Sequence, residues 1–263
     1  MNLLKLMIGG IICVIWFLII HTIKMFRMYL VLLEHRVDFK KFIFAYLRTT
    51  LVNLIIPFKL GEIYRMFVYS RMTGNAGTGI AGTLVDRFFD TAALVLILIP
   101  LHVLYPDKIS GVSVFLAVFV ILTVFVYLIF MPAYGYLNKY IIMNRESRNS
   151  MAVLRFLEVI RSAYDYVKRL VSGRYAIIIL MSFAAWVLEG GLLFVIAWIT
   201  GIDYNAGVFS DYITSIMSTV SNALQVKYTV FSIVVIAICT LATGIYLYAG
   251  RNKKSIRSEK VER

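Results

Sequence analysis

Five stretches of this 263-residue chain are long and apolar enough to cross a lipid bilayer as helices. A helix needs roughly 20 apolar residues to cross a hydrocarbon core of ~30 Å. In chain order the stretches are residues 6–23, 78–101, 109–138, 175–200 and 228–250. The first, third and fifth contain no Asp, Glu, Lys or Arg. The sequence therefore predicts an all-α, polytopic integral membrane protein with about five transmembrane helices.

Composition supports this class and excludes others. The chain is 61% hydrophobic, whereas soluble domains are about half apolar. In a soluble protein, a net charge of +13 would suggest nucleic-acid binding. Here the basic residues flank apolar spans, so membrane topology and anionic headgroups explain them, and we expect no nucleic-acid partner. Both cysteines lie in apolar spans and the three histidines are scattered, so no metal or cofactor site is predicted.

Orientation follows from the distribution of Lys and Arg. Basic residues concentrate in residues 24–48, 139–174 and 251–263, whereas residues 105–111 contain one lysine and residues 201–210 contain no Lys or Arg. Cytoplasmic loops carry the excess of basic residues. We therefore expect a multi-pass protein of the cell membrane (plasma or inner membrane), with its N-terminus outside and its C-terminus in the cytoplasm. Residues 1–250 form one membrane domain, and residues 251–263 form a basic cytoplasmic tail.

The segment 42–72 has a different pattern. Residues 42–56 reach only ~22 Å as a helix, and Pro57 and Gly61 then interrupt the backbone. Residues 61–72 are shorter still. We expect a re-entrant helical hairpin that enters from the cytoplasm and returns; two tilted, shortened spans are the alternative.

Two further segments read as amphipathic helices. Residues 151–171 carry apolar residues at helical spacing and a basic opposite face, which predicts a cytoplasmic interfacial helix. An ordinary linker helix packed on the protein explains the pattern equally well. Residues 211–226 have a neutral polar face and would lie at the outer interface or dip in to line a cavity.

A group of charged residues surrounds the predicted backbone break. Arg65 and Arg87 are the cations, with Lys59 nearby, and the carboxylates are Glu62, Asp86 and Asp90. An ionisable residue within a membrane is costly and is a functional-site hypothesis by default. Irregular backbone at that depth is tolerated only inside protein or along a wet cavity. Residues three or four apart share a helix face, so we expect the carboxylates to pair with Arg65 and Arg87.

These residue types suit a lipid phosphate. Arginine stays charged when buried, and its planar fork matches phosphate oxygens in pairs. We therefore predict that Arg65, Arg87 and Lys59 hold a phosphate and that the three carboxylates orient them or receive an amine. Asn53, Pro57 and Gly61 would shape the break. A purely structural salt-bridge network and an ion or proton path are the alternatives.

Glu189 lies near the middle of its span and is followed by two glycines. It could pair with the charged group, carry a proton, or donate a hydrogen bond when protonated. No catalytic triad, metalloprotease, P-loop or dinucleotide motif is present in the sequence, so we do not expect an enzyme.

The spacing Asn53-x-x-x-Pro57-x-x-x-Gly61-Glu62-x-x-Arg65, followed by Asp86-Arg87-x-x-Asp90, resembles the lysylphosphatidylglycerol synthase transmembrane, or flippase-like, family. The resemblance covers roughly residues 6–200. It implies a stand-alone member without the aminoacyl-transferase domain. The later Pro/Gly-rich, Glu-containing motif of that family has no match, since residues 207–230 contain no proline.

The resemblance and the charged residues together imply a membrane protein that binds, and translocates, an anionic phospholipid or a lipid-linked glycan intermediate in envelope lipid or polysaccharide biosynthesis. A lipid- or glycan-synthesising protein would be its partner. Three alternatives remain open: a non-transporting scaffold of such a complex, a small ion-coupled transporter, and a membrane-bound lipid-modifying enzyme.

Overall fold

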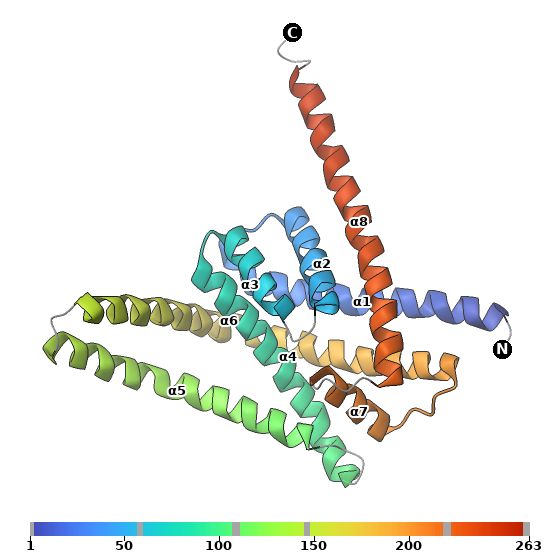
Figure 1. The fold of residues 1–263 in the computed structure, drawn as a ribbon, viewed down its shortest axis with the longest axis horizontal. Helices are drawn as coiled ribbons and strands as arrows, with labels where there is room; N and C mark the ends of the chain where they lie inside the picture. Colours follow the sequence, from blue (N-terminus) through green and yellow to red (C-terminus); the bar gives the residue numbers. More distant parts are fainter. Residues whose placement is uncertain (1–2, 57–59, 107–110, 145–147, 218–221, 260–263) are drawn as a thin grey trace.

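The computed structural model describes residues 3–56, 60–106, 111–144, 148–217 and 222–259, and their regular structure is entirely helical (Figure 1). The helices are α1 Leu3–Leu32, α2 Phe39–Ile55, α3 Leu60–Thr73, α4 Ala76–Leu104, α5 Val112–Asn144, α6 Arg148–Thr200, α7 Ala206–Met217 and α8 Ala223–Glu259, with a short 3-10 helix at Leu33–His35 after α1. The all-α class predicted from the sequence is confirmed.

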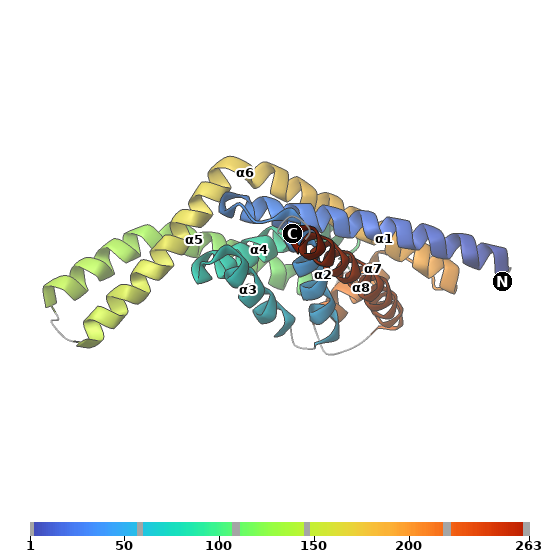
Figure 2. The same cartoon turned by 90° about the horizontal axis from the view of Figure 1, so that it is seen from above.

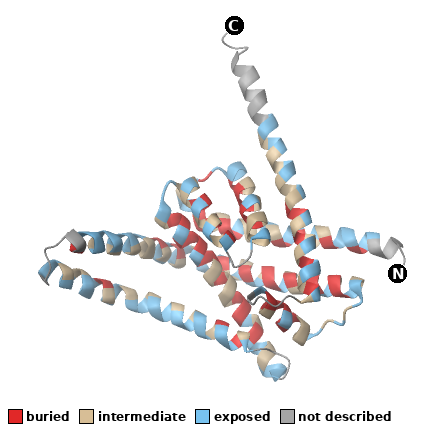
Figure 3. Cartoon of the chain, in the orientation of Figure 1, coloured by how far each residue is buried: buried red, intermediate tan, exposed pale blue. Residues whose placement is uncertain are grey.

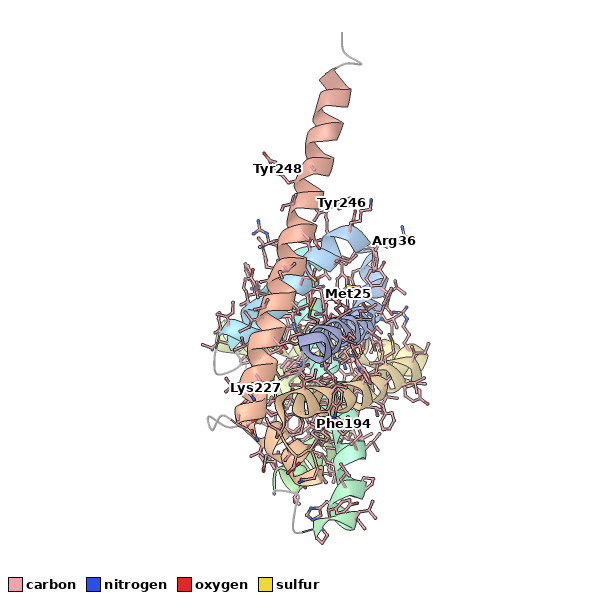
Figure 4. All side chains as sticks on the ribbon, turned by 90° about the vertical axis from the view of Figure 1, so that its right-hand side faces the viewer. Met25, Arg36, Phe194, Lys227, Tyr246 and Tyr248 are labelled. Atoms are coloured by element: carbon pink, nitrogen blue, oxygen red, sulfur yellow. The ribbon has the colours of Figure 1, made fainter. Side chains whose placement is uncertain are left out.

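Five of these helices, α1, α4, α5, α6 and α8, are long and apolar enough to cross a membrane. Four of them contain one predicted stretch each, and α5 contains residues 112–138 of the stretch 109–138, so the polytopic architecture is confirmed. α8 continues past the last of those stretches as far as Glu259. Figure 4 places Lys227 near the start of α8, and Tyr246 and Tyr248 where the helix extends beyond the others.

Helices α1, α4 and α6 meet at the centre of the molecule, where Figure 3 shows the buried residues concentrated. Phe17 of α1, Leu94 of α4 and Leu193 of α6 belong to one apolar cluster and are almost fully buried. Lipid tails are as apolar as these side chains, so close packing and buried polar contacts must hold the helices together. The polar contacts at this crossing are therefore structurally important.

Helices α2 and α3 form a short hairpin beside α4 (Figure 1). They have 17 and 14 residues, or ~25 Å and ~21 Å of helix, and neither is among the candidate spans. The Asp38 side chain accepts a hydrogen bond from the Lys41 N–H and caps α2. Gly74, with a φ of 68°, turns the chain into α4, which Asn75 caps. The two short helices agree with the predicted hairpin; Pro57 lies outside the described residues.

Residues 151–171 are helical, as predicted, but they form the first half of a longer helix and pack on the protein, as the linker-helix alternative expected. One helix, α6, runs from Arg148 to Thr200 and bends midway (Figure 2). Its first half packs on α5, with the Tyr164 ring stacked 4.9 Å from the rings of Tyr127 and Phe130. Gly173, near the expected end, does not stop the helix, because one glycine weakens a helix by only about 1 kcal/mol.

The prediction of a single amphipathic helix over residues 211–226 is wrong. α7 ends at Met217, and α8 starts at Ala223. Asn205 and Asn222 each accept a hydrogen bond from a backbone N–H shortly after them, which starts a helix at each position. Tyr212 and Ile213 of α7 are buried in the central apolar cluster, so this helix packs into the protein.

Candidate functional site

The centre of the site is Arg27, a residue that the sequence analysis placed in a loop. α1 does not end at residue 23 but continues to Leu32, which brings Arg27 between α4 and α6. Arg27 is 1% exposed. Its Nε donates to Asp86 Oδ1 at 2.7 Å, and its Nη1 donates to Asp90 Oδ1 at 2.5 Å and to Ser182 Oγ at 2.9 Å. Arg27 therefore joins three helices through one guanidinium.

Lys24, one turn earlier on α1, is the second residue that the analysis missed. It forms an ion pair with Glu189 of α6, and its Nζ lies 5.5 Å from the centre of the Trp186 ring. The charge-free stretch 6–23 predicts that the span ends before Lys24, its first basic residue. The apolar sequence that continues from Met25 to Leu33 was the available signal that the helix does not stop there.

The predicted pairing around Arg87 is confirmed. Arg87 Nη2 donates to Asp86 Oδ2 at 2.7 Å, and its Nη1 lies 3.6 Å from both Asp90 Oδ2 and Glu62 Oε1. Asp86 is thus shared between Arg27 and Arg87. The Arg87 side chain is 38% exposed, whereas that of Asp86 is 3% exposed. Arg87 is accordingly the cation of this group most open to a ligand.

Arg65 and Glu62 pair on α3 at the backbone break, as predicted. Arg65 Nη1 lies 3.3 Å from Glu62 Oε2, and Asn53 of α2 donates to Glu62 Oε1 at 3.0 Å. A Cβ on Gly61 would lie 2.4 Å from the Asn53 Cα, so only glycine allows the two helices this approach. Asn53 and Gly61 therefore shape the hairpin next to the charges. Pro57 and Lys59 lie outside the described residues.

Glu189 forms a second centre beside the first. Its Oε1 accepts from the Tyr212 hydroxyl at 2.9 Å, and its Oε2 pairs with Lys24. Trp186 separates the two centres and donates from Nε1 to the Asp90 carbonyl oxygen at 3.0 Å. Of the three roles considered for Glu189, the structure shows the ion pair, with a cation that the analysis had not placed nearby.

Together these side chains form one group, which we call the charge cluster: Lys24, Arg27, Glu62, Arg65, Asp86, Arg87, Asp90 and Glu189. It contains four cations and four carboxylates. Each charge faces an opposite one, which offsets the several kcal/mol that burying an unpaired ion costs. Within the described ranges, no group of His, Cys, Asp and Glu could hold a metal ion.

Two donors in the charge cluster stay unused. The Nε atoms of Arg65 and Arg87 are buried and have no hydrogen-bond partner in the described part of the chain. A buried donor without a partner costs about 1–3 kcal/mol. An anion with several oxygens supplies the acceptors that such donors require.

The comparisons with known proteins agree with this architecture. A family model described as the lysylphosphatidylglycerol synthase TM region matches residues 2–226. The UPF0104 membrane protein MJ1078 of Methanocaldococcus jannaschii is 26% identical over 183 residues, which cover 64% of this chain and 70% of that protein. The search of solved structures found no match.

Proposed function

Because the chain belongs to the family described as the lysylphosphatidylglycerol synthase TM region, we propose that it binds the phosphate of an anionic lipid at Arg65 and Arg87 and moves that lipid between leaflets. The lipid is a phospholipid or a lipid-linked glycan. The observation that carries the proposal is the pair of buried guanidinium Nε donors, on Arg65 of α3 and Arg87 of α4, that have no hydrogen-bond partner among the described residues.

Arg87 is the entry point of this site. It is the most exposed cation of the charge cluster, and its distance to Glu62 is a loose 3.6 Å. A phosphate oxygen can replace Glu62 there, because charge-assisted hydrogen bonds to arginine form at about 2.7–2.9 Å and are the stronger contact. Glu62 would keep its contacts with Arg65 and Asn53, and its Oε1 could also accept a hydrogen bond from the ammonium group of a zwitterionic or cationic headgroup.

Arg27 has a different role in this proposal. Its carboxylate partners hold it in a buried position with 1% of the side chain exposed, so a headgroup cannot reach it. By neutralising Asp86 and Asp90, it prevents these carboxylates from repelling an incoming phosphate. Arg27 is a positioning residue, and the phosphate contacts fall to Arg65 and Arg87.

Leaflet exchange in proteoliposomes tests the proposal. Exchange of fluorescent phosphatidylglycerol is expected with the wild type and lost in an Arg65→Ala, Arg87→Ala double variant. Arg155→Ala is the matched control, because Arg155 is an exposed arginine outside the charge cluster. Normal exchange by a correctly folded double variant would overturn the proposal.

A scaffold in a lipid- or glycan-synthesising complex is the second candidate, and the exact charge balance of the cluster favours it, since four pairs can serve structure alone. No exchange with phosphatidylglycerol or polyprenyl-phosphate probes, together with co-purification of a synthesising enzyme, would select the scaffold. Conversion of a lipid by the purified protein alone would instead select an enzyme.

We also propose that the protein lies in the cell membrane with its N-terminus outside and its C-terminus in the cytoplasm. Lys24 and Arg27 no longer count toward a basic loop, but Arg36, Lys40, Lys41 and Arg48 remain in that region. Single-cysteine variants at Tyr105 and Arg251 test this orientation with a membrane-impermeant thiol reagent on intact cells. Labelling is expected at position 105 and not at position 251.

A further inference from the structure

A groove lies between α4, α6 and α7, away from the backbone break. It encloses about 530 Å³ and is lined by Ile97, Leu101, Tyr105, Trp186, Val187, Gly190, Tyr204, Asn205, Ala206 and Phe209. This volume is in the range of small-molecule sites, about 300–1,000 Å³. No charged side chain lines the groove, so it offers no ion pair to a phosphate.

The polar lining residues gather at one end. Tyr105 follows the last residue of α4, and Tyr204 and Asn205 lie in the connection between α6 and α7. Aromatic residues with a polar tip prefer the level of the headgroups. This end of the groove is therefore its mouth, at the membrane surface opposite the α3–α4 turn.

The apolar end reaches the charge cluster. Trp186 forms the inner wall, and its Nε1 donates to the Asp90 carbonyl oxygen. Along α4, the lining residues from Ile97 to Tyr105 rise ~12 Å, which is comparable with the ~15 Å that one leaflet contributes to a hydrocarbon core of ~30 Å. The groove thus extends from the surface to the depth of Asp90, across about one leaflet.

We propose that this groove holds one acyl chain of a glycerophospholipid in the leaflet opposite the basic loops. Its length matches a chain that spans a single leaflet, whereas a polyprenyl chain is methyl-branched and much longer. The uncharged lining suits a hydrocarbon chain, and the Tyr105, Tyr204 and Asn205 mouth suits a headgroup at the surface. This inference rests on the proposed function, because the groove would be a second binding position for the lipid whose phosphate Arg65 and Arg87 bind.

Gly190 provides a direct test of occupancy. A Cβ at this position would lie 3.8 Å from Phe209 and from the Tyr204 hydroxyl, so Gly190→Ala fits and Gly190→Leu fills the groove. Ala206→Leu fills it from α7. The matched control is Gly135→Leu on α5, where an added Cβ would meet no atom within 4 Å.

The experiment uses phosphatidylglycerol with a photoreactive diazirine on its acyl chain, in vesicles that contain the whole protein. Mass spectrometry is expected to find cross-links on α6 and α7 residues of the groove in excess of those on α5. Gly190→Leu and Ala206→Leu should lose this excess, whereas Gly190→Ala and Gly135→Leu should keep it.

Equal labelling of the groove and α5, or labelling unchanged by both filling variants, would overturn the proposal. Stronger groove labelling by a photoreactive polyprenyl phosphate would overturn the choice of an acyl chain. Because the cross-links are read without a transport assay, the two proposals can fail separately. Groove labelling without lipid exchange would support the acyl-chain site and reject translocation. Lipid exchange that depends on Arg65 and Arg87, without groove labelling, would support translocation and reject the acyl-chain site.

Discussion

Arg27 of α1 donates its Nε–H to Oδ1 of Asp86 on α4 at 2.7 Å, and both side chains are almost completely buried. The two residues are 59 positions apart in the chain. Because Asp86 also accepts from Arg87, this ion pair connects the most buried cation of the charge cluster to the most exposed one. The pair fixes the carboxylates beside which the proposed phosphate would bind.

We expect Arg27→Met to destabilise the protein strongly. Removal of one partner of a buried ion pair costs about 3–5 kcal/mol, because the remaining charge is left uncompensated. Thermal unfolding in detergent measures the loss. The Arg27→Met, Asp86→Asn double variant restores charge balance around Arg87 and Asp90 and should be more stable than the single variant. A double variant no more stable than Arg27→Met would contradict the pairing.

Arg87→Ala should separate binding from stability. Its side chain is 38% exposed, and Asp86 keeps Arg27 as a partner, so the expected change in stability is below about 1 kcal/mol. Binding of phosphatidylglycerol, measured by native mass spectrometry, should nevertheless fall sharply. A variant that unfolds readily, or one that binds the lipid as tightly as the wild type does, would assign Arg87 to structure alone.

Gly61→Ala should force α2 and α3 apart, because the added Cβ would lie 2.4 Å from the Asn53 Cα. Overpacking of this kind typically costs about 1–3 kcal/mol. Gly10→Ala on α1 is the control: its Cβ would meet no atom within 4 Å, and alanine should stabilise that helix slightly. The unfolding temperatures of the two variants are compared with that of the wild type. A Gly61→Ala variant that unfolds at the same temperature as the wild type would argue against the close approach of α2 and α3.

Glu189→Gln should leave Lys24 without its counter-charge next to the aromatic ring of Trp186. The Tyr212 hydroxyl can still donate to the amide oxygen, so the loss reports mainly on the ion pair. We expect a clear drop in unfolding temperature, which an additional Lys24→Met substitution partly reverses. If the single variant retained full stability but lost a proton dependence of lipid exchange, Glu189 would instead be a proton carrier.

The local features of this protein were determined by its sequence. Five apolar stretches predicted five long helices, because a span needs only length and the absence of charge. The break between Asn53 and Gly61 followed from residues that interrupt a helix. Glu62 pairs with Arg65, and Arg87 with Asp90, because the two members of each pair lie three residues apart on one helix and so share a face.

Only the tertiary structure decided which distant residues complete the site. Lys24 and Arg27 resemble the basic end of a span, and the apolar residues that follow them do not show which carboxylates the two cations face. Their partners Glu189 and Asp86 lie 165 and 59 positions away, so the contacts depend on how α1, α4 and α6 cross. The physical reason is that a helix can carry a cation into the membrane only where another helix presents a carboxylate at the same depth. That depth is set by packing.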